Sequence, residues 1–253
     1  MINTIVNKKI DLDQYKSEGY TGPIQFCSPD QAEIWRKEFY QVLGQDEKKP
    51  KKANHDLSAF HHDHLWAYNI CTNPVITDSI SQILNSEDLF LWAMHFWYKE
   101  PGNRNYIPWH QDKNYWPMNP AINATAWIAL GESKKENGCL RLIPGTHKNE
   151  YKHEELDKLS SLGEGIKDVN ESKALDLEME PGQVVFFNES IIHGSKANDS
   201  NIARVACSVR YTIPSVSFAI DEWGGNKERI KTFLVKGEDR FHYNDSITGI
   251  IPN

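Results

Sequence analysis

The chain has 253 residues, of which 39% are hydrophobic and 25% are charged, and its formal net charge is −7. This composition is ordinary for a soluble globular protein, and the length allows a single domain over 1–253. The negative charge offers no general attraction to nucleic acid or anionic lipid, so we expect neither nucleic acid nor a membrane as partner.

The N-terminal third is predicted to be mainly helical. Ser28-Pro29-Asp30 resembles a helix start, and the apolar residues that follow recur at helical spacing as far as Val42-Leu43. A second helix is predicted from Asn73-Pro74 to Leu84 on the same grounds. These elements would form a helical layer over about residues 1–88.

From Leu89 onward the sequence predicts strands. Short segments rich in aromatic and β-branched residues alternate with turn residues such as Pro-Gly and Asn-Gly. The segments are LFLWAMHFWY, ATAWIAL, CLRLIP, GQVVFF and RVACSVRYTI. Many short strands with such turns indicate a mainly β fold, a sandwich or a jelly roll, over about residues 89–218.

Two segments do not follow this pattern. Residues 147–180 are charged and predicted to be a mostly helical insertion over one end of the β core. The tail beyond Phe218 is polar, and no element is predicted in it.

Cysteine usage and apolar runs indicate a cytoplasmic location. The four cysteines, at positions 27, 71, 139 and 207, have no short-range pairing typical of a disulfide framework or zinc site. The first residues lack the apolar core of a signal peptide, and no apolar run is long enough to span a membrane. The sequence does not indicate an oligomeric state.

His110 and Asp112 are the first candidates for a metal site. A facial triad of two histidines and one carboxylate leaves three positions open on iron for co-substrate and O₂. In an extended segment, residues two apart point to the same side. The third ligand must come from a distant strand, and His193 follows the strand-like run GQVVFF.

Spacing alone does not identify the site, because other pairs compete. His61 and Asp63 have the same spacing within the HHDH cluster, and His153 with Glu155 is a near match. The aromatic surroundings of His110, at the start of the β-rich region, favour it over these rivals.

Arg204 makes the constellation more specific. It follows His193 by eleven residues and enters a predicted strand. The planar guanidinium suits bidentate binding of a carboxylate, as the distal end of 2-oxoglutarate would require.

With these residues the chain resembles the phytanoyl-CoA dioxygenase (PhyH-like) family of Fe(II)/2-oxoglutarate oxygenases. The matching segments lie between about residues 89 and 214 and occur in the family's order. They are FWYKEPG, WHQDKNYWP, ATAWIAL, ENGCLRLIPGTHK, PGQVVFFNESIIHGS and the strand that carries Arg204.

The resemblance implies a double-stranded β-helix (jelly-roll) core with an N-terminal helical layer. It implies Fe(II) held by His110, Asp112 and His193, with Arg204 binding the tail of 2-oxoglutarate. Trp127 matches a family tryptophan near the co-substrate, although its side chain could equally be a core aromatic. His95 falls near another co-substrate position. Lys99, before a Pro-Gly turn, reads as a surface residue.

Asp112 indicates the reaction type. Family members that halogenate have a small residue in place of this carboxylate, so its presence makes hydroxylation the expected reaction. The aromatic side chains Trp97, Trp109, Tyr115 and Trp116 would suit the walls of a site that protects a reactive oxidant.

The substrate is less well indicated. The segment LWAYNICTNPVITDSISQIL, with FWYKEPG and WHQDKNYWP, resembles a bacterial branch that includes 2-aminoethylphosphonate hydroxylases. A small anion of this kind would need a cation near the metal, and Lys113 and Arg210 are candidates, with Trp116 beside them. The alternatives are a lipid or acyl thioester and a secondary metabolite.

Two other classes of protein remain open. A cupin-like hydrolase or isomerase could use the same ligands for zinc or manganese, but this leaves Arg204 unexplained. A non-catalytic β-sandwich binding module would leave both Arg204 and the triad unexplained.

Overall fold

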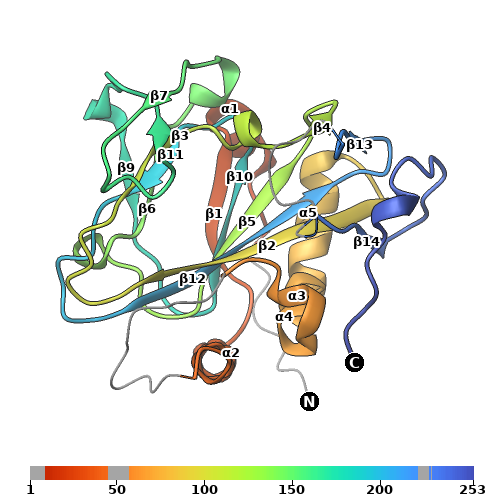
Figure 1. Cartoon of the computed structure of the whole chain (residues 1–253), viewed down its shortest axis with the longest axis horizontal. Coiled ribbons are helices and arrows are strands. Elements are labelled where there is room, and N and C mark those ends of the chain that lie inside the picture. The colour runs from red at the N-terminus through yellow and green to blue at the C-terminus, as the bar shows by residue number, and fades with distance from the viewer. Residues whose placement is uncertain (1–8, 45–56, 222–227, 229) are drawn as a thin grey trace.

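The computed structural model describes residues 9–44, 57–221, 228 and 230–253. Two antiparallel sheets form its centre (Figure 1). The larger contains, in spatial order, β1 (Tyr20–Gln25), β10 (Gln183–Asn188), β5 (Ala124–Ala129), β12 (Arg204–Thr212), β2 (Leu89–Lys99) and β14 (Phe233–Lys236). The smaller contains β3 (Ile107–His110), β11 (His193–Ser195), β6 (Leu140–Leu142) and β9 (Leu175–Leu177). Short pairs join β4 (Met118–Asn119) to β13 (Ser217–Phe218), and β7 (Glu154–Glu155) to β8 (Glu164–Gly165).

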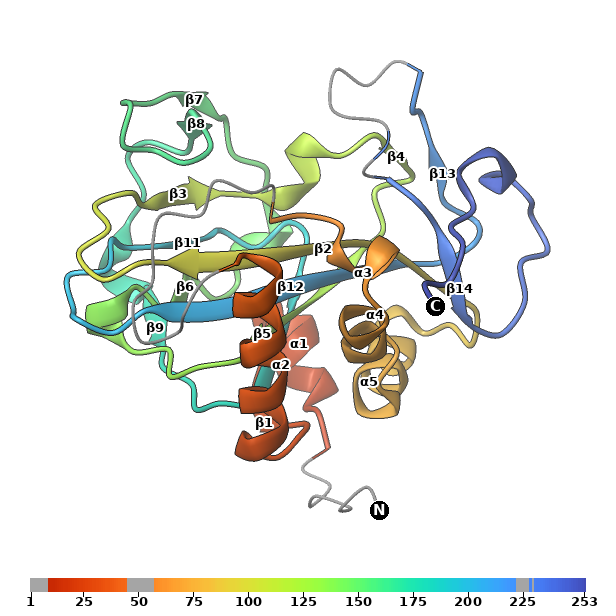
Figure 2. The same cartoon turned by 60° about the horizontal axis from the view of Figure 1, so that its bottom comes forward.

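A layer of helices covers one side of the larger sheet, and the smaller sheet lies on its other side (Figure 2). The helices are α1 (Leu12–Glu18), α2 (Pro29–Val42), α3 (Phe60–Asp63), α4 (Leu65–Cys71) and α5 (Pro74–Leu84). The expected fold class, a mainly β jelly roll with an N-terminal helical layer, is confirmed.

The two predicted helices begin where their capping residues place them. The Ser28 hydroxyl accepts a hydrogen bond from the Gln31 amide, 3.2 Å away, at the start of α2. The Asn73 side chain accepts one from the Val75 amide, 2.9 Å away, at the start of α5. Such caps satisfy amide groups that have no partner within the helix.

Strand β12 separates the core beneath the helices from the space between the two sheets. Its odd-numbered residues, from Val205 to Tyr211, pack into the core beneath the helices. Its even-numbered residues point the other way because side chains alternate along a strand. The space between the two sheets therefore receives Arg204, Ala206, Ser208 and Arg210.

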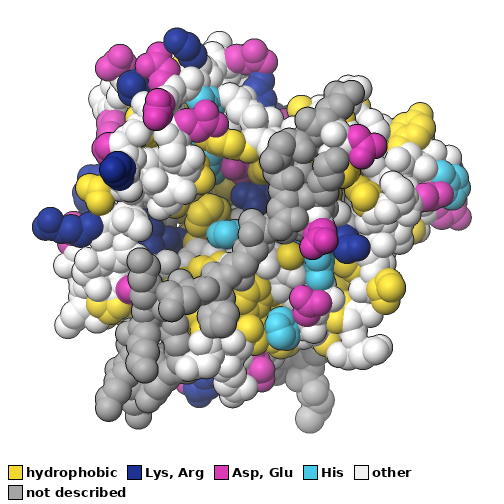
Figure 3. Space-filling model, in the orientation of Figure 1, with side chains coloured by type: hydrophobic (Ala, Val, Ile, Leu, Met, Phe, Trp, Pro, Cys, Tyr) yellow, Lys and Arg dark blue, Asp and Glu magenta, His cyan; other side chains and the backbone are white. Residues whose placement is uncertain are grey.

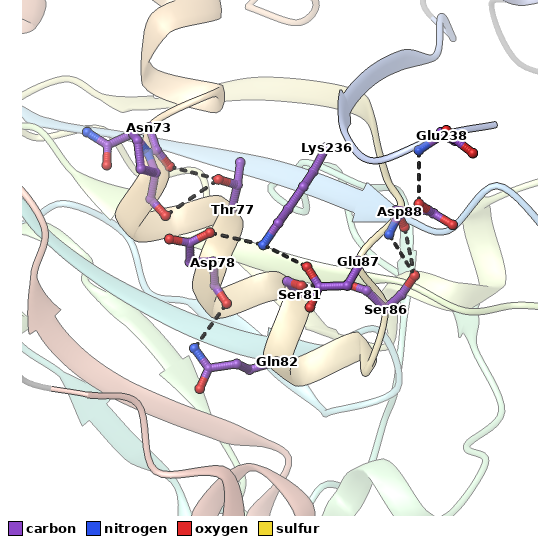
Figure 4. Close-up of polar contacts among 11 residues, drawn as sticks. Asn73, Thr77, Asp78, Ser81, Gln82, Ser86, Glu87, Asp88, Lys236 and Glu238 are labelled. Atoms are coloured by element: carbon purple, nitrogen blue, oxygen red, sulfur yellow. Dashed lines mark hydrogen bonds and ion pairs between the residues drawn. The ribbon is translucent and has the colours of Figure 1, made fainter.

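The larger sheet extends beyond the boundaries expected for the β core. Strand β1, within the N-terminal third, pairs with β10, and β14, within the tail, pairs with β2. Figure 4 shows how β14 is fixed to the helical layer: the Lys236 ammonium lies 3.1 Å from Asp78 of α5 and 3.3 Å from Glu87. The predicted limits of 89 and 218 were therefore too narrow.

The insertion at 147–180 is not helical, contrary to expectation. It contains the end of a 3-10 turn at Thr146–Lys148, the short pair β7–β8, a second 3-10 turn at Glu171–Lys173 and strand β9, and no α-helix. Gly163 and Asp168 have positive φ angles of 76° and 54°, which interrupt a helix. The Ile166 amide instead donates to the Trp109 carbonyl, 2.7 Å away, so the segment packs along β3.

Within the described ranges, no helix is long and apolar enough to cross a membrane.

Candidate active site

His110, Asp112 and His193 converge between the sheets. His110 ends β3, and His193, the first residue of β11, is its direct cross-strand partner. The two imidazole rings are 4.1 Å apart. The sequence predicted that Asp112 would continue the extended segment of His110. It instead begins a 3-10 turn (Asp112–Tyr115), which carries its carboxylate to the rings.

Both imidazoles are oriented as metal ligands. The Nδ1 atom of His110 lies 2.8 Å from the Pro108 carbonyl, and that of His193 lies 3.1 Å from the Ile191 carbonyl. A carbonyl accepts a hydrogen bond, so each Nδ1 carries the proton and each Nε2 keeps a lone pair. These Nε2 atoms lie 3.4 and 3.8 Å from the Asp112 carboxylate.

The electrostatics of this group fit a bound cation. Burial, with the neighbouring His110, lowers the pKa of His193 to about 3, so its Nε2 is unprotonated at neutral pH. Burial alone would raise the pKa of Asp112, but Arg210 and the histidines outweigh it and hold that pKa well below its usual range. The Oδ2 atom of Asp112 is buried without a hydrogen-bond partner. Two lone pairs and a carboxylate that face one another are the donor set of a divalent metal.

His110 and His193 line a narrow cavity between the sheets, which we call the central cavity, and the Asp112 carboxylate lies behind them. Figure 3 shows hydrophobic, histidine and basic side chains gathered in a hollow on this face of the molecule. The walls of the cavity include Trp97, Trp127, Ser195, Arg204 and Arg210.

Arg204 and Trp127 meet at one part of the cavity wall. The Arg204 guanidinium lies 5.5 Å from the centre of the Trp127 ring and is almost completely buried, with 2% exposed. The Ser195 hydroxyl, which lines the same cavity, is buried without a hydrogen-bond partner. An unpartnered hydroxyl and a guanidinium form a suitable pair for a carboxylate.

His95 and Lys99 lie in an adjoining space, the side recess. It shares Trp97, Ile107 and Arg204 with the central cavity. The His95 ring is 4.4 Å from that of Trp97. Lys99 is buried, with 5% exposed, so its interpretation as a surface residue was wrong.

Of the two predicted substrate-binding cations, the structure brings only Arg210 to the cavity. Its guanidinium lies 3.5 Å from Asp112 and 4.9 Å from the centre of the Trp116 ring. Lys113 instead pairs with Glu150, 2.5 Å away, and does not line the cavity.

Trp109, expected as a wall, points out of the cavity. Its indole nitrogen donates to Glu171, 2.9 Å away, and Arg141 stacks on its ring.

The rival histidines do not reach the triad. His61 is completely buried against His62 and Phe233, which makes it a residue of the core. His153 lies near the metal motif but accepts a hydrogen bond from the Gln111 amide, 3.1 Å away. The expectation that the HHDH cluster stays outside the site is therefore confirmed.

Sequence reasoning missed Gln111, Ser195 and Lys99. Each lies within two residues of a quoted motif residue or inside a quoted segment, yet its residue type is common on surfaces. Only their burial in the folded chain distinguishes them.

Known proteins share this fold. A structure described as the non-heme monooxygenase ThoJ, in its apo form, has a TM-score of 0.78 at 22% identity, covering 96% of this chain and 89% of that one. CytC3 with Fe(II) and alpha-ketoglutarate has a TM-score of 0.69 at 21% identity, with 96% of each chain covered. At these identities the likeness concerns the fold.

Sequence relatives identify the family. A probable phytanoyl-CoA dioxygenase of Caenorhabditis elegans is 31% identical over 180 residues, which are 67% of this chain and 58% of that protein. The peroxisomal phytanoyl-CoA dioxygenase of Homo sapiens is 36% identical over 134 residues, 51% of this chain and 39% of that protein. The chain thus spans less than two thirds of the length of either relative. Since the family model of phytanoyl-CoA dioxygenase (PhyH) matches residues 15–206, the chain belongs to the phytanoyl-CoA dioxygenase family.

Proposed function

We propose that this protein is a non-haem Fe(II)- and 2-oxoglutarate-dependent dioxygenase that hydroxylates a small molecule. One observation carries the proposal: the Nε2 atoms of His110 and His193 converge with the Asp112 carboxylate at the wall of the cavity that Arg204 also lines. A zinc or manganese hydrolase would use the same triad, but it would have no use for a buried guanidinium there.

The residues have separate roles in this proposal. His110, Asp112 and His193 would hold Fe(II), which supplies the activation of O₂ that hydroxylation requires. Arg204 and Ser195 would bind the distal carboxylate of 2-oxoglutarate, and Trp127 would fix the guanidinium from one side. Trp97, whose indole nitrogen donates to Ser208 at 2.9 Å, would exclude water from the centre of the cavity.

The test of this activity combines a product assay with an Arg204→Lys variant. Purified protein supplied with Fe(II) and 2-oxoglutarate should form succinate when a substrate is present. An ammonium cannot reproduce the two parallel hydrogen bonds of a guanidinium, so Arg204→Lys should raise the KM for 2-oxoglutarate about tenfold or more. Arg240→Lys, at an exposed position, is the matched control and should leave the KM unchanged. An unchanged KM in Arg204→Lys would remove the main support for the proposal.

For the substrate we propose a small anion, with an aminoalkylphosphonate as the first compound to test. Arg210 supports this choice, because it places a charged guanidinium in the cavity beside Asp112. A bound phosphonate there would hold its α-carbon next to the metal, and such positioning accounts for much of catalysis. A wholly apolar cavity would instead have favoured a lipid-like substrate.

Arg210→Gln tests the substrate class, with Lys113→Gln as its comparison. Arg210→Gln should lower kcat/KM for 2-aminoethylphosphonate at least tenfold, because it removes the only cation that we assign to the phosphonate. Lys113→Gln should have little effect, since its ammonium is paired with Glu150. A metal titration of Arg210→Gln separates loss of substrate binding from a disturbed Asp112. Succinate formation driven by acyl thioesters but not by phosphonates would reject the small-anion class and leave the iron chemistry intact.

A further inference from the structure

Lys99 lies beside Arg204 on the interior face of the larger sheet. The two residues are direct cross-strand partners on β2 and β12. Side chains of such a pair project to the same face, and the face that carries Arg204 also carries Ser208, which lines the central cavity. Both Lys99 and Arg204 line the side recess. A second basic side chain therefore lies next to the guanidinium that we assign to the co-substrate.

Two backbone carbonyls hold the Lys99 amine. Its Nζ donates to the Asn105 carbonyl, 3.3 Å away, and to the Lys196 carbonyl. The chain passes close above it at Gly138, where a Cβ atom would lie 3.0 Å from the Lys99 stem and 2.6 Å from the Lys196 carbonyl. Glycine at this position, within the motif ENGCLRLIPGTHK, thus makes room for the buried lysine.

The hydrogen bonds of Lys99 suit the neutral amine. A neutral amine has two N–H groups, and two carbonyls accept them. A protonated amine has a third N–H group and a full charge. Among the described residues, neither Lys99 nor Arg204 has a carboxylate as an electrostatic neighbour. Burial, with the adjacent Arg204, lowers the pKa of Lys99 to about 6.

We propose that Lys99 is a second cation of the 2-oxoglutarate site and takes up a proton when this anion binds at Arg204. The proton comes from solvent and is held on Nζ, and no other bond is made or broken. The negative charge of the bound carboxylate favours the charged amine, as a nearby opposite charge does in general. The inference rests on the proposed function, because it needs the co-substrate tail to lie at Arg204.

Few other groups around Lys99 can titrate. Arg204 of β12 stays charged, since burial lowers its pKa only to about 10. The Cys139 thiol, before β6, stays protonated because burial raises its pKa to about 12. His95 of β2 shares the side recess, and so does Tyr98, whose phenol stays protonated because burial raises its pKa. The other polar residues there, Asn103, Asn105 and Ser161, carry no charge.

Isothermal titration calorimetry measures how many protons the protein takes up when 2-oxoglutarate binds. 2-Oxoglutarate is titrated into the Ni(II)-loaded full chain at pH 7, in phosphate and in Tris, which differ in heat of ionisation. The difference between the two binding heats gives the number of protons taken up. We expect uptake of a large fraction of one proton in the wild type and none in Lys99→Met. Lys196→Met, which removes an exposed charge on the neighbouring segment, should retain the uptake.

The pH dependence of binding gives a second readout. Lys99 is neutral in the free protein above pH 6, so rising pH makes the required proton scarcer and weakens binding, with a slope of at most about one log unit in Kd per pH unit. Lys99→Met should bind more weakly at pH 6.5, with a flatter pH profile. Lys99→Gln, whose amide can still donate to the carbonyls, should behave like Lys99→Met and guards against a folding defect.

The outcomes separate this inference from the proposed function. Absence of proton uptake in the wild type, or unchanged uptake in Lys99→Met, would overturn the role of Lys99. In that case, 2-oxoglutarate binding to an Arg204→Met variant shows whether the proposed co-substrate site is also wrong. If it loses 2-oxoglutarate binding, only the role of Lys99 fails; if it binds as tightly as the wild type, the co-substrate site itself is elsewhere.

Discussion

Gln111 lies between two of the proposed metal ligands, and its side chain is completely buried. Its amide nitrogen donates to the Asn149 carbonyl, 2.8 Å away, and to the Ser190 carbonyl. Its Oε1 accepts a hydrogen bond from the Tyr151 amide, 3.1 Å away. One side chain thus ties the metal motif to the insertion and to the loop that leads into His193.

Replacement of Gln111 by Glu should weaken metal binding. A carboxylate keeps the acceptor for Tyr151 but loses both donated hydrogen bonds, and loss of such supporting contacts typically costs about 10- to 100-fold in metal affinity. Titration of the metal-free protein with Ni(II) measures this. Gln41→Glu, at an exposed position of α2, is the control and should bind Ni(II) as the wild type does. Wild-type affinity in Gln111→Glu would mean that the other contacts position the ligands without it.

At the scale of elements, β8 supports the strand that carries His110. Gly165 lies so close to β3 that a Cβ atom would approach the Trp109 carbonyl to 2.8 Å and Pro108 to 2.9 Å. The contact involves backbone on one side and a proline ring on the other, neither of which can move easily. The insertion therefore forms part of the frame of the metal site.

Gly165→Ala should accordingly both destabilise the protein and weaken metal binding. We expect the free energy of unfolding to fall by about 1–3 kcal/mol, as overpacking usually causes, in a denaturant titration of the metal-free chain. Gly131→Ala is the matched control, because the added methyl would meet only the flexible Arg36 side chain, at 3.4 Å. If Gly165→Ala destabilised the fold without any change in Ni(II) affinity, β8 would have no part in positioning His110.

Element prediction succeeded where local signals agreed with the final packing. The caps of α2 and α5 and the aromatic and β-branched runs of β2, β5, β10 and β12 are all in the sequence. Strand β1 was missed because Gly22-Pro23 interrupts it, and β14 because it has only four residues; both pair with strands far away in the chain. The insertion was predicted to be mostly helical from its charged, helix-like sequence, whereas pairing with β3 decides its conformation.

For the whole molecule, the metal triad and Arg204 were predictable because each lies in a motif whose combination of residue types is rare outside such a site. Lys99 was not, since a lysine before a Pro-Gly turn is exposed in most proteins. Its burial follows from the crossing of the segments around Gly138 and Lys196, which no local pattern in the sequence reveals. The placement of Arg210 in the cavity and of Lys113 outside it likewise depends on the turn at Asp112.

Strand β12 carries Arg204 near one end of its interior face and Arg210 near the other. Six residues of extended chain separate them, a spacing of about 20 Å at the usual rise per residue. Since both arginines are carried by one strand, the distance between their backbone positions is fixed. If Arg204 binds the distal carboxylate, as we propose, the length of a dicarboxylic acid is limited by Arg204 at one end and by the triad at the other, and a ligand of Arg210 must approach beside Asp112.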